Sequence, residues 1–236
     1  MRNILLVALL TFTSIVSAET GTEDLFGAWG TAVFQGKLSD TKFLWYLEGS
    51  ARATDNVRTK TSHSGDGFDL HILMGRAAVG YQLNDTNKVY LGYAYQESDA
   101  PYSRVRLSEH RIYQQHDYKY VFDNKDTLAF RTRLEERNVD VSSDTSVRFR
   151  EQLKYTHPLT PKLSLVASEE IFVNTNSVNW GPQSGFDQNR GFVGVGYKFN
   201  DKFRTEVGYL NQYMNRVNNY DRMAHVLSVT LYGDFI

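Results

Sequence analysis

The most chemically distinctive feature of this sequence is a pair of segments with basic residues at alternate positions. Both segments alternate polar and apolar residues, which is the pattern of a β-strand with one polar and one apolar face. The polar faces carry six cations and one acid: Arg131, Arg133, Glu135, Arg137, Arg148, Arg150 and Lys154. A ring of Arg and Lys side chains around a pore selects anions, so these residues are candidates to line a narrow pore for small anionic solutes.

A symmetric hairpin between the two segments predicts which residues are neighbours. It places Arg137 beside Arg148, Glu135 beside Arg150, Arg133 beside Gln152 and Arg131 beside Lys154. The resulting excess of positive charge is costly at low dielectric, so it needs water or carboxylate partners.

Two interpretations of this charge stay open. In one, the arginines bridge a narrow barrel and form a polar plug with carboxylates elsewhere, for which the candidates are Glu48, Glu109, Glu169 and Glu170. In the other, they line a water-filled path for anions. Small barrels mostly fill their lumen with side chains, which favours the plug.

The elements that must position these residues are further strands of the same kind. Ten stretches show strand patterning: 42–53, 68–83, 88–97, 106–122, 127–138, 146–157, 163–174, 189–199, 203–214 and 223–235. Residues 25–36 are an eleventh candidate. Bacterial barrels have an even number of strands and both termini in the periplasm. We therefore expect either that 25–36 is not a full wall strand or that a twelfth strand exists.

Short turns alternate with longer polar connections along these stretches. The short turns are 84–87, 123–126, 158–161 and 200–202. The longer loops are 55–67, 97–104, 138–146, 174–188 and 215–222. Outer-membrane barrels have this plan, with short connections on the periplasmic side and long ones outside.

Residue parity assigns one face of each strand to lipid and the other to the lumen. Phe43 and Leu47 are predicted to face lipid, whereas Glu48 and Arg52 face the lumen and are read as a self-neutralising pair. The same parity predicts an outward position for Leu91, Tyr93, Val193, Val195, Leu227, Val229 and Leu231. For the stretch 163–174, where Glu169 and Glu170 are adjacent, parity does not decide which side chains face lipid and which face the lumen.

The N-terminal 18 residues predict a secretion signal, with a basic start, an apolar core and small residues before cleavage near Ala18. Residues 19–236 then form a single barrel domain. The chain has no cysteine, and no later segment is apolar enough for a transmembrane helix, so only a closed barrel could span a membrane. Loss of Arg2 changes the net charge from −1 to −2, which argues against a nucleic-acid partner.

Catalytic patterns are weak in this chain, so we expect no enzyme, no cofactor and no metal centre. The six histidines (His63, His71, His110, His116, His157 and His225) have no Ser or acid at a spacing that demands a triad. The loop 64–67 with Asp69 has oxygen ligands for calcium, but such a sequence is more often a glycine turn. Two alternatives to a non-enzymatic barrel stay open: an outer-membrane lipid-modifying hydrolase and a soluble periplasmic β-protein.

The C-terminal part of the chain also carries a family resemblance. It reads NRGFVGVGYKF over 189–199 and EVGYLNQY over 206–213. Together with Trp45 and the run 131–135, this resembles the outer-membrane family known as domain of unknown function 2490. The resemblance implies a barrel in the outer membrane and brings no catalytic residues. The plan, though not the motifs, is similar to small porins for acidic oligosaccharides.

Together these patterns predict an all-β fold, an antiparallel transmembrane β-barrel of the outer-membrane type with 10–12 strands. The expected partners are outer-membrane lipid, the barrel-assembly machinery during insertion and small anionic solutes. A purely structural surface barrel with a plugged lumen also stays open, as does the oligomeric state.

Overall fold

The computed structural model describes residues 22–55, 68–99, 102–103, 106–216 and 221–236. The predicted signal peptide (1–18) lies outside the described residues, as do His63 and the loop 64–67. The described residues form eleven strands: β1 Thr22–Lys37, β2 Phe43–Asp55, β3 Phe68–Gln82, β4 Asn87–Ser98, β5 Leu107–Val121, β6 Thr127–Val139, β7 Ser142–Pro158, β8 Leu163–Asn174, β9 Gly185–Lys198, β10 Phe203–Met214 and β11 Asp221–Phe235.

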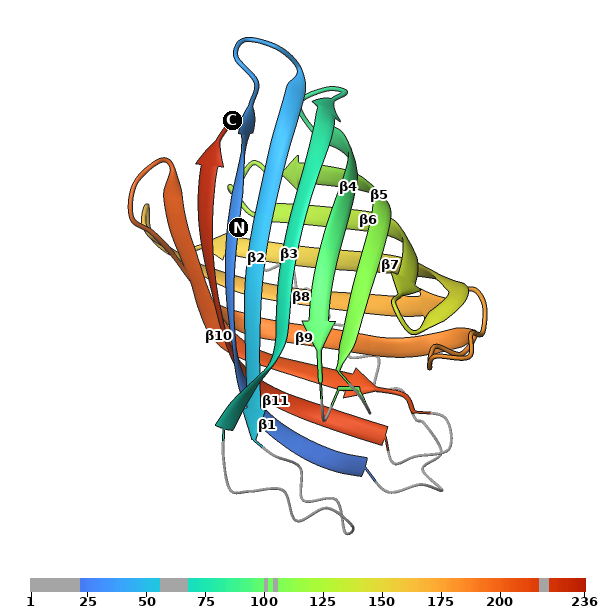
Figure 1. Cartoon of the computed structure of the whole chain (residues 1–236). Coiled ribbons are helices and arrows are strands. Elements are labelled where there is room, and N and C mark those ends of the chain that lie inside the picture. Colours follow the sequence, from blue (N-terminus) through green and yellow to red (C-terminus); the bar gives the residue numbers. More distant parts are fainter. Residues whose placement is uncertain (1–21, 56–67, 100–101, 104–105, 217–220) are drawn as a thin grey trace.

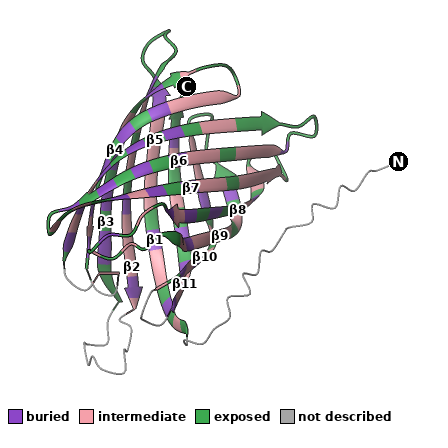
Figure 2. Cartoon of the chain, turned by 90° about the vertical axis from the view of Figure 1, so that its right-hand side faces the viewer, coloured by how far each residue is buried: buried purple, intermediate pink, exposed green. Residues whose placement is uncertain are grey.

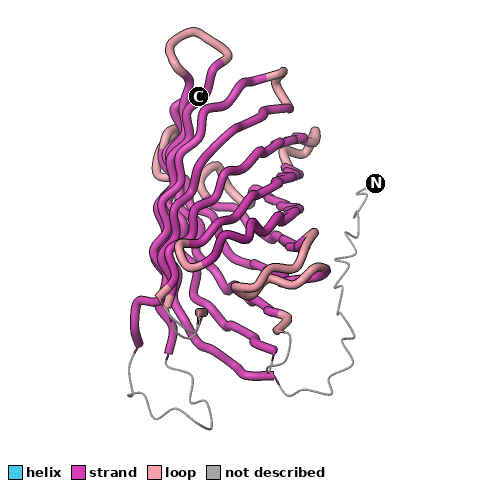
Figure 3. The backbone as a smooth tube through the Cα atoms, turned by 45° about the vertical axis from the view of Figure 1, so that its right-hand side comes forward, coloured by secondary structure: helices cyan, strands magenta, loops and turns pink. Residues whose placement is uncertain are grey.

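These strands form one closed barrel in the order β1-β11-β10-β9-β8-β7-β6-β5-β4-β3-β2 (Figure 1). The strands β2–β5 run steeply across those of the opposite wall, β6–β10, and the tube view shows the described chain as strands joined by loops (Figure 3). Among the described residues, no helix is long and apolar enough to cross a bilayer. The predicted all-β barrel class is confirmed.

The eleventh strand candidate is a full wall strand, and the expected even strand number is wrong. The strand β1 pairs antiparallel with β2 and parallel with β11, from Thr22↔Asp221 to Gly36↔Phe235. An up-and-down chain of eleven strands starts and ends with strands of the same direction, so its closing seam must be parallel. Thr22 therefore lies at the end of the barrel opposite to Phe235.

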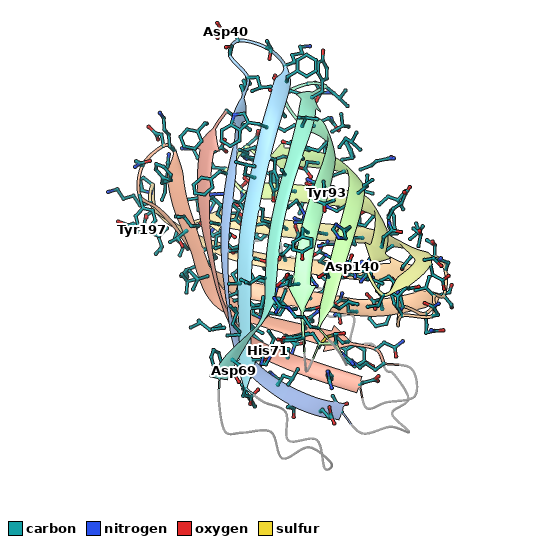
Figure 4. All side chains as sticks on the ribbon, in the orientation of Figure 1. Asp40, Asp69, His71, Tyr93, Asp140 and Tyr197 are labelled. Atoms are coloured by element: carbon teal, nitrogen blue, oxygen red, sulfur yellow. The ribbon has the colours of Figure 1, made fainter. Side chains whose placement is uncertain are left out.

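The connections at one end of the barrel are short and those at the other end are mostly long. The short-turn end holds 38–42, 83–86, 122–126, 159–162 and 199–202. Figure 4 labels Asp40 at this end and Asp69 and His71 at the opposite, long-loop end. One predicted long loop, 138–146, is wrong. The strands β6 and β7 stay paired through a bulge up to Val139↔Ser142, which leaves a two-residue turn at 140–141.

The predicted faces are confirmed by the alternation of burial along the strands (Figure 2). The outward side chains form an exposed apolar surface that includes Phe43, Leu47, Leu91, Tyr93, Ile112, Leu134, Phe149, Leu165, Val193, Val195, Leu227, Val229 and Leu231. The structure also decides the faces of β8. Glu170 and Phe172 are buried in the interior, whereas Glu169 is exposed on the outer face. The outward position of Glu169 removes it from the predicted partners of the lumen arginines.

Candidate functional site: a charged lumen

All seven predicted lumen residues point into the barrel from the inner faces of β6 and β7. Arg133 and Glu135 are the most enclosed, with side chains 1% and 0% exposed. Arg131 and Lys154 are the most accessible of the set, at 25% and 20%. The alternating pattern therefore places every predicted side chain on one wall, as the period of a strand requires.

The predicted pairing within this hairpin is wrong by two residues. The observed register places Glu135 opposite Arg148, Arg133 opposite Arg150 and Arg137 opposite Ser146. The prediction assumed a long symmetric loop, whereas the two-residue turn and the bulge displace β7 along β6. As a result Lys154 lies opposite Ala129 rather than Arg131, which separates two cations.

Glu135 is the centre of the ion-pair network. Its Oε2 accepts hydrogen bonds from Nη2 of Arg148 at 2.7 Å and from Nε at 3.1 Å, and its Oε1 accepts one from Nη1 of Arg150 at 2.6 Å. Nη1 of Arg133 lies 3.6 Å from Oε1. One buried carboxylate thus holds two arginines by direct hydrogen bonds and lies close to a third.

Carboxylates on the flanking strands complete the network. Glu170 on β8 accepts from Arg131 at 2.8 Å and from Arg150 at 2.7 Å. Glu109 on β5 accepts from Arg111 at 2.8 Å and from Arg137 at 2.5 Å. The carboxylates of Glu109 and Glu170 are therefore the partners that the plug interpretation expected of them.

Other contacts tie the network to distant strands. Nζ of Lys154 on β7 donates to both carboxylate oxygens of Glu206 on β10, at 2.7 and 2.6 Å. Glu48 accepts from Arg76 at 2.7 Å, so the predicted pair of Glu48 with Arg52 is wrong. Among the described lumen residues, eight basic side chains share six carboxylates: Arg76, Arg111, Arg131, Arg133, Arg137, Arg148, Arg150 and Lys154 with Glu48, Glu109, Glu135, Glu170, Asp187 and Glu206.

Above this network a cavity of about 920 Å³ opens toward the long-loop end. Of the predicted residues, Arg131, Arg137, Arg148 and Arg150 line it, whereas Arg133, Glu135 and Lys154 do not. We call this space the outer chamber. Its lining does not include Lys154 or Glu206, whose ion pair joins β7 to β10.

Loop residues form the rim of the outer chamber. The Trp180 ring lies 5.1 Å from the guanidinium carbon of Arg137, and its Nε1 donates to the backbone oxygen of Asp144 at 3.0 Å. Across the rim, Nη2 of Arg216 donates to the backbone oxygen of Tyr102 at 3.3 Å. These contacts hold loops from three connections around the same opening.

The candidate set from the sequence missed two chamber residues, Arg52 and Arg190. The alternation of residues along β2 and β9 turns both side chains toward the lumen. On β9, however, Arg190 has no second inward basic residue nearby, so the search for alternating basic residues did not find it. Both guanidinium groups lie against Trp29, whose place in the wall depends on β1. The only signal for them in the sequence was their inward parity.

The described histidines are held by acids, tyrosines and an asparagine. On the outer face His110 contacts Tyr93 and Asp140, both labelled in Figure 4, and His225 contacts Tyr209 and Asp24 in the same way. Among the described histidines, none has a serine hydroxyl as a hydrogen-bond partner. The described part of the chain also contains no group of three or more His, Cys, Asp or Glu placed to hold a metal ion.

Comparison with known proteins places the chain among uncharacterised relatives. The family model described as "Protein of unknown function (DUF2490)" matches residues 26–224. An uncharacterized protein of Methylorubrum extorquens is 35% identical over 173 residues, covering 71% of this chain and 75% of the relative. The outer-membrane expressed OmpT of Vibrio cholerae superposes with a TM-score of 0.41 at 12% identity. That match covers 73% of this chain and 55% of the OmpT chain, so this chain spans about half the length of that protein.

Proposed function

This chain belongs to the DUF2490 family of unknown function, and we propose that it is an outer-membrane β-barrel that admits small anions to its lumen and is not an enzyme. The observation that carries the proposal is the positively charged outer chamber. The predicted signal peptide, outer-membrane lipid and the barrel-assembly machinery are part of the same proposal.

Three features support a position in a membrane. The barrel closes on itself, which pairs the backbone groups that a lipid environment cannot satisfy. Its strands contain 12 to 17 residues, more than the roughly 9–11 that a tilted strand needs to cross a bilayer. The outer face carries large exposed apolar side chains, as lipid contact requires, among them Phe43, Leu91 and Val193.

The charge of the chamber supports anion entry. Its basic side chains outnumber its carboxylates, and a positive cavity with low-dielectric walls raises the local concentration of anions. The rim at the long-loop end would face outward in an outer-membrane barrel, because long connections lie outside. Anions would therefore enter from the outer side and stop at the Lys154–Glu206 ion pair, beyond the lining of the chamber.

Collisional quenching of Trp29 tests whether anions reach the chamber. Trp29 lines the chamber, and Trp45→Phe/Trp180→Phe leaves it as the single tryptophan. We expect iodide to quench its fluorescence about threefold or more better than caesium, because the positive field concentrates anions and excludes cations. High salt should reduce the difference by screening.

The matched control keeps Trp45 as the single tryptophan, since it lies on the outer face against Phe235. Iodide and caesium should quench Trp45 without this preference. Equal quenching of Trp29 by both ions would show that the chamber does not favour anions, and no quenching by iodide would show a plugged structural barrel. Either result would overturn the proposal.

Planar-bilayer recording tests whether the Lys154–Glu206 ion pair closes the lumen to ions. The double variant Lys154→Ala/Glu206→Ala removes both charges of the pair that joins β7 to β10, so it leaves no unpaired charge behind. We expect its unitary conductance to exceed that of the wild type several-fold and to remain anion-selective. The control is Lys198→Ala/Asp201→Ala, which removes an exposed ion pair at a short turn. Identical currents from all three proteins would mean that another layer closes the lumen.

A further inference from the structure

We propose that Arg52, Arg190 and Trp29 form a binding site in the outer chamber for a small organic anion with an apolar body. This inference rests on the proposed function, because the ligand must be able to enter the chamber. It adds the site and the chemical class of the ligand. The three residues come from β2, β9 and β1, so the site exists only in the closed barrel.

The two guanidinium groups share one aromatic ring. The guanidinium carbon of Arg52 lies 4.3 Å from the ring centroid of Trp29, and that of Arg190 lies 5.3 Å from it. Arg190 also lies 4.6 Å from the ring of Phe172. Stacking on aromatic rings orients a guanidinium group while leaving its N–H donors free for a ligand.

Neither arginine has a carboxylate partner in the described part of the chain, where no Asp or Glu oxygen lies within 4.0 Å of it. This distinguishes them from Arg131, Arg148 and Arg150 in the same chamber, each of which has an ion pair. Glu170 is the cross-strand neighbour of Arg190, but its hydrogen bonds go to Arg131 and Arg150.

One donor of the site has no hydrogen bond at all. Nε of Arg190 is buried and makes no hydrogen bond within the described structure. An unpaired buried donor on a charged group is costly, and a bound carboxylate would remove that cost by accepting from the planar fork of donors. The site therefore favours an anion with two oxygens, such as a carboxylate.

Trp29 packs among apolar side chains, of which Met214, Tyr102 and Leu210 also line the chamber. Trp29 belongs to a buried cluster with Leu25, Met214, Ala224 and Val226, against which Tyr102 and Leu210 pack. Ile72, Met74 and Leu107 also line the chamber. A ligand held by the two arginines would thus place its remaining atoms against hydrocarbon, which favours an apolar body over a sugar or an inorganic ion.

The size of the chamber fits such a ligand. Its volume of about 920 Å³ lies near the upper end of small-molecule sites, which span roughly 300–1,000 Å³. Phenylacetate is a suitable probe, since it combines a carboxylate with an aromatic ring. Phenylacetamide keeps the shape without the charge, and acetate keeps the charge without the ring.

Isothermal titration calorimetry of the refolded protein in nanodiscs of zwitterionic lipid tests the site. We expect phenylacetate to bind with a Kd below about 1 mM, and phenylacetamide and acetate to bind at least about tenfold more weakly. Arg52→Gln and Arg190→Gln should each weaken phenylacetate binding by about tenfold or more, as expected when a charged hydrogen-bond partner is lost. Arg190→Lys, which keeps the charge but loses the fork, should also weaken it.

Arg204→Gln is the matched control. In the described structure Arg204 also has no carboxylate within 4.0 Å, and it lies 3.8 Å from the ring centroid of Tyr232, but it does not line the chamber. Phenylacetate binding should therefore not change in this variant.

Equal binding of phenylacetamide and phenylacetate, or an equal loss of phenylacetate binding in Arg204→Gln, would overturn the site. If iodide still quenches Trp29 while phenylacetate does not bind, this inference fails and the proposed function stands. If iodide does not quench Trp29 and phenylacetate does not bind, both the proposed function and this inference are overturned.

Discussion

Replacing Glu135 with alanine should lower the free energy of unfolding by about 3–5 kcal/mol, because it breaks a buried ion pair on one side only. The fully buried carboxylate is the shared acceptor of Arg148 and Arg150 and lies 3.6 Å from Arg133. Without it, the carboxylates left within ion-pair distance in the described part of the chain are Asp187 for Arg148, at 3.3 Å, and Glu170 for Arg150. Like charges would then face each other without a counter-charge between them.

Urea unfolding of the barrel in lipid vesicles, followed by tryptophan fluorescence, measures this loss. Glu136→Gln is a matched control, since Glu136 is the next residue of β6 and is exposed on the outer face. We expect it to change the free energy of unfolding by less than about 0.5 kcal/mol.

A second variant keeps the test informative if Glu135→Ala does not refold. Glu135→Leu/Arg148→Met/Arg150→Met replaces the carboxylate and the two arginines that it holds by hydrogen bonds with apolar side chains, and such replacements are often neutral or stabilising. Arg133 keeps its hydrogen bond to Gln115. It should therefore refold. Equal stability of Glu135→Ala and the wild type would show that water or ions already neutralise the arginines.

Replacing Val229 with arginine should destabilise the barrel in a bilayer by about 2–4 kcal/mol, the cost of a cation near the midplane on the lipid face. Val229 lies near the middle of β11, 40% exposed, between outward Leu227 and Leu231. Its direct neighbours are Gly30 on β1 and Val207 on β10, and neither offers a counter-charge. The only way to solvate the new charge is to reach along the surface to the headgroups.

Leu159→Arg makes the same change in a short turn, where the side chain is 48% exposed outside the strands. Its cost should stay within about 1 kcal/mol, as for substitutions near the interfaces. The two free energies of unfolding are compared in the same vesicles. If Val229→Arg costs no more than Leu159→Arg, the outer face contacts water, and the membrane position we propose is wrong.

The two predictions test opposite faces of the same wall. Glu135 tests whether the lumen is held together by charge, and Val229 tests whether the outside faces hydrocarbon. A barrel that depends on both would explain why its mean hydropathy is low, at −0.45, while its outer face is apolar. In such a chain the apolar residues occupy alternate positions, so an average along the sequence hides them.

The sequence by itself determined ten of the strands and the faces of most of them, but not the faces of 163–174. The stretch 203–214 coincides with β10, and 163–174 coincides with β8. The inward positions of Glu135 and Arg150 followed from parity. These features are local, because a strand points successive side chains to opposite sides whatever its neighbours are. The short turns were also readable, since Asn, Asp and Pro favour turns through their own backbone preferences.

Only the tertiary structure decided the strand number, the register and the charge partners. Closure through a parallel β1–β11 seam depends on where both ends of the barrel meet, which no local pattern reports. The register of β6 with β7 depends on a bulge and a two-residue turn, and it determined that Glu135 lies opposite Arg148. Glu206 reaches Lys154 from three strands away, and Arg52 and Arg190 meet at Trp29 only because the sheet closes. Parity says that a charge points inward, but closure of the barrel decides which charge it meets.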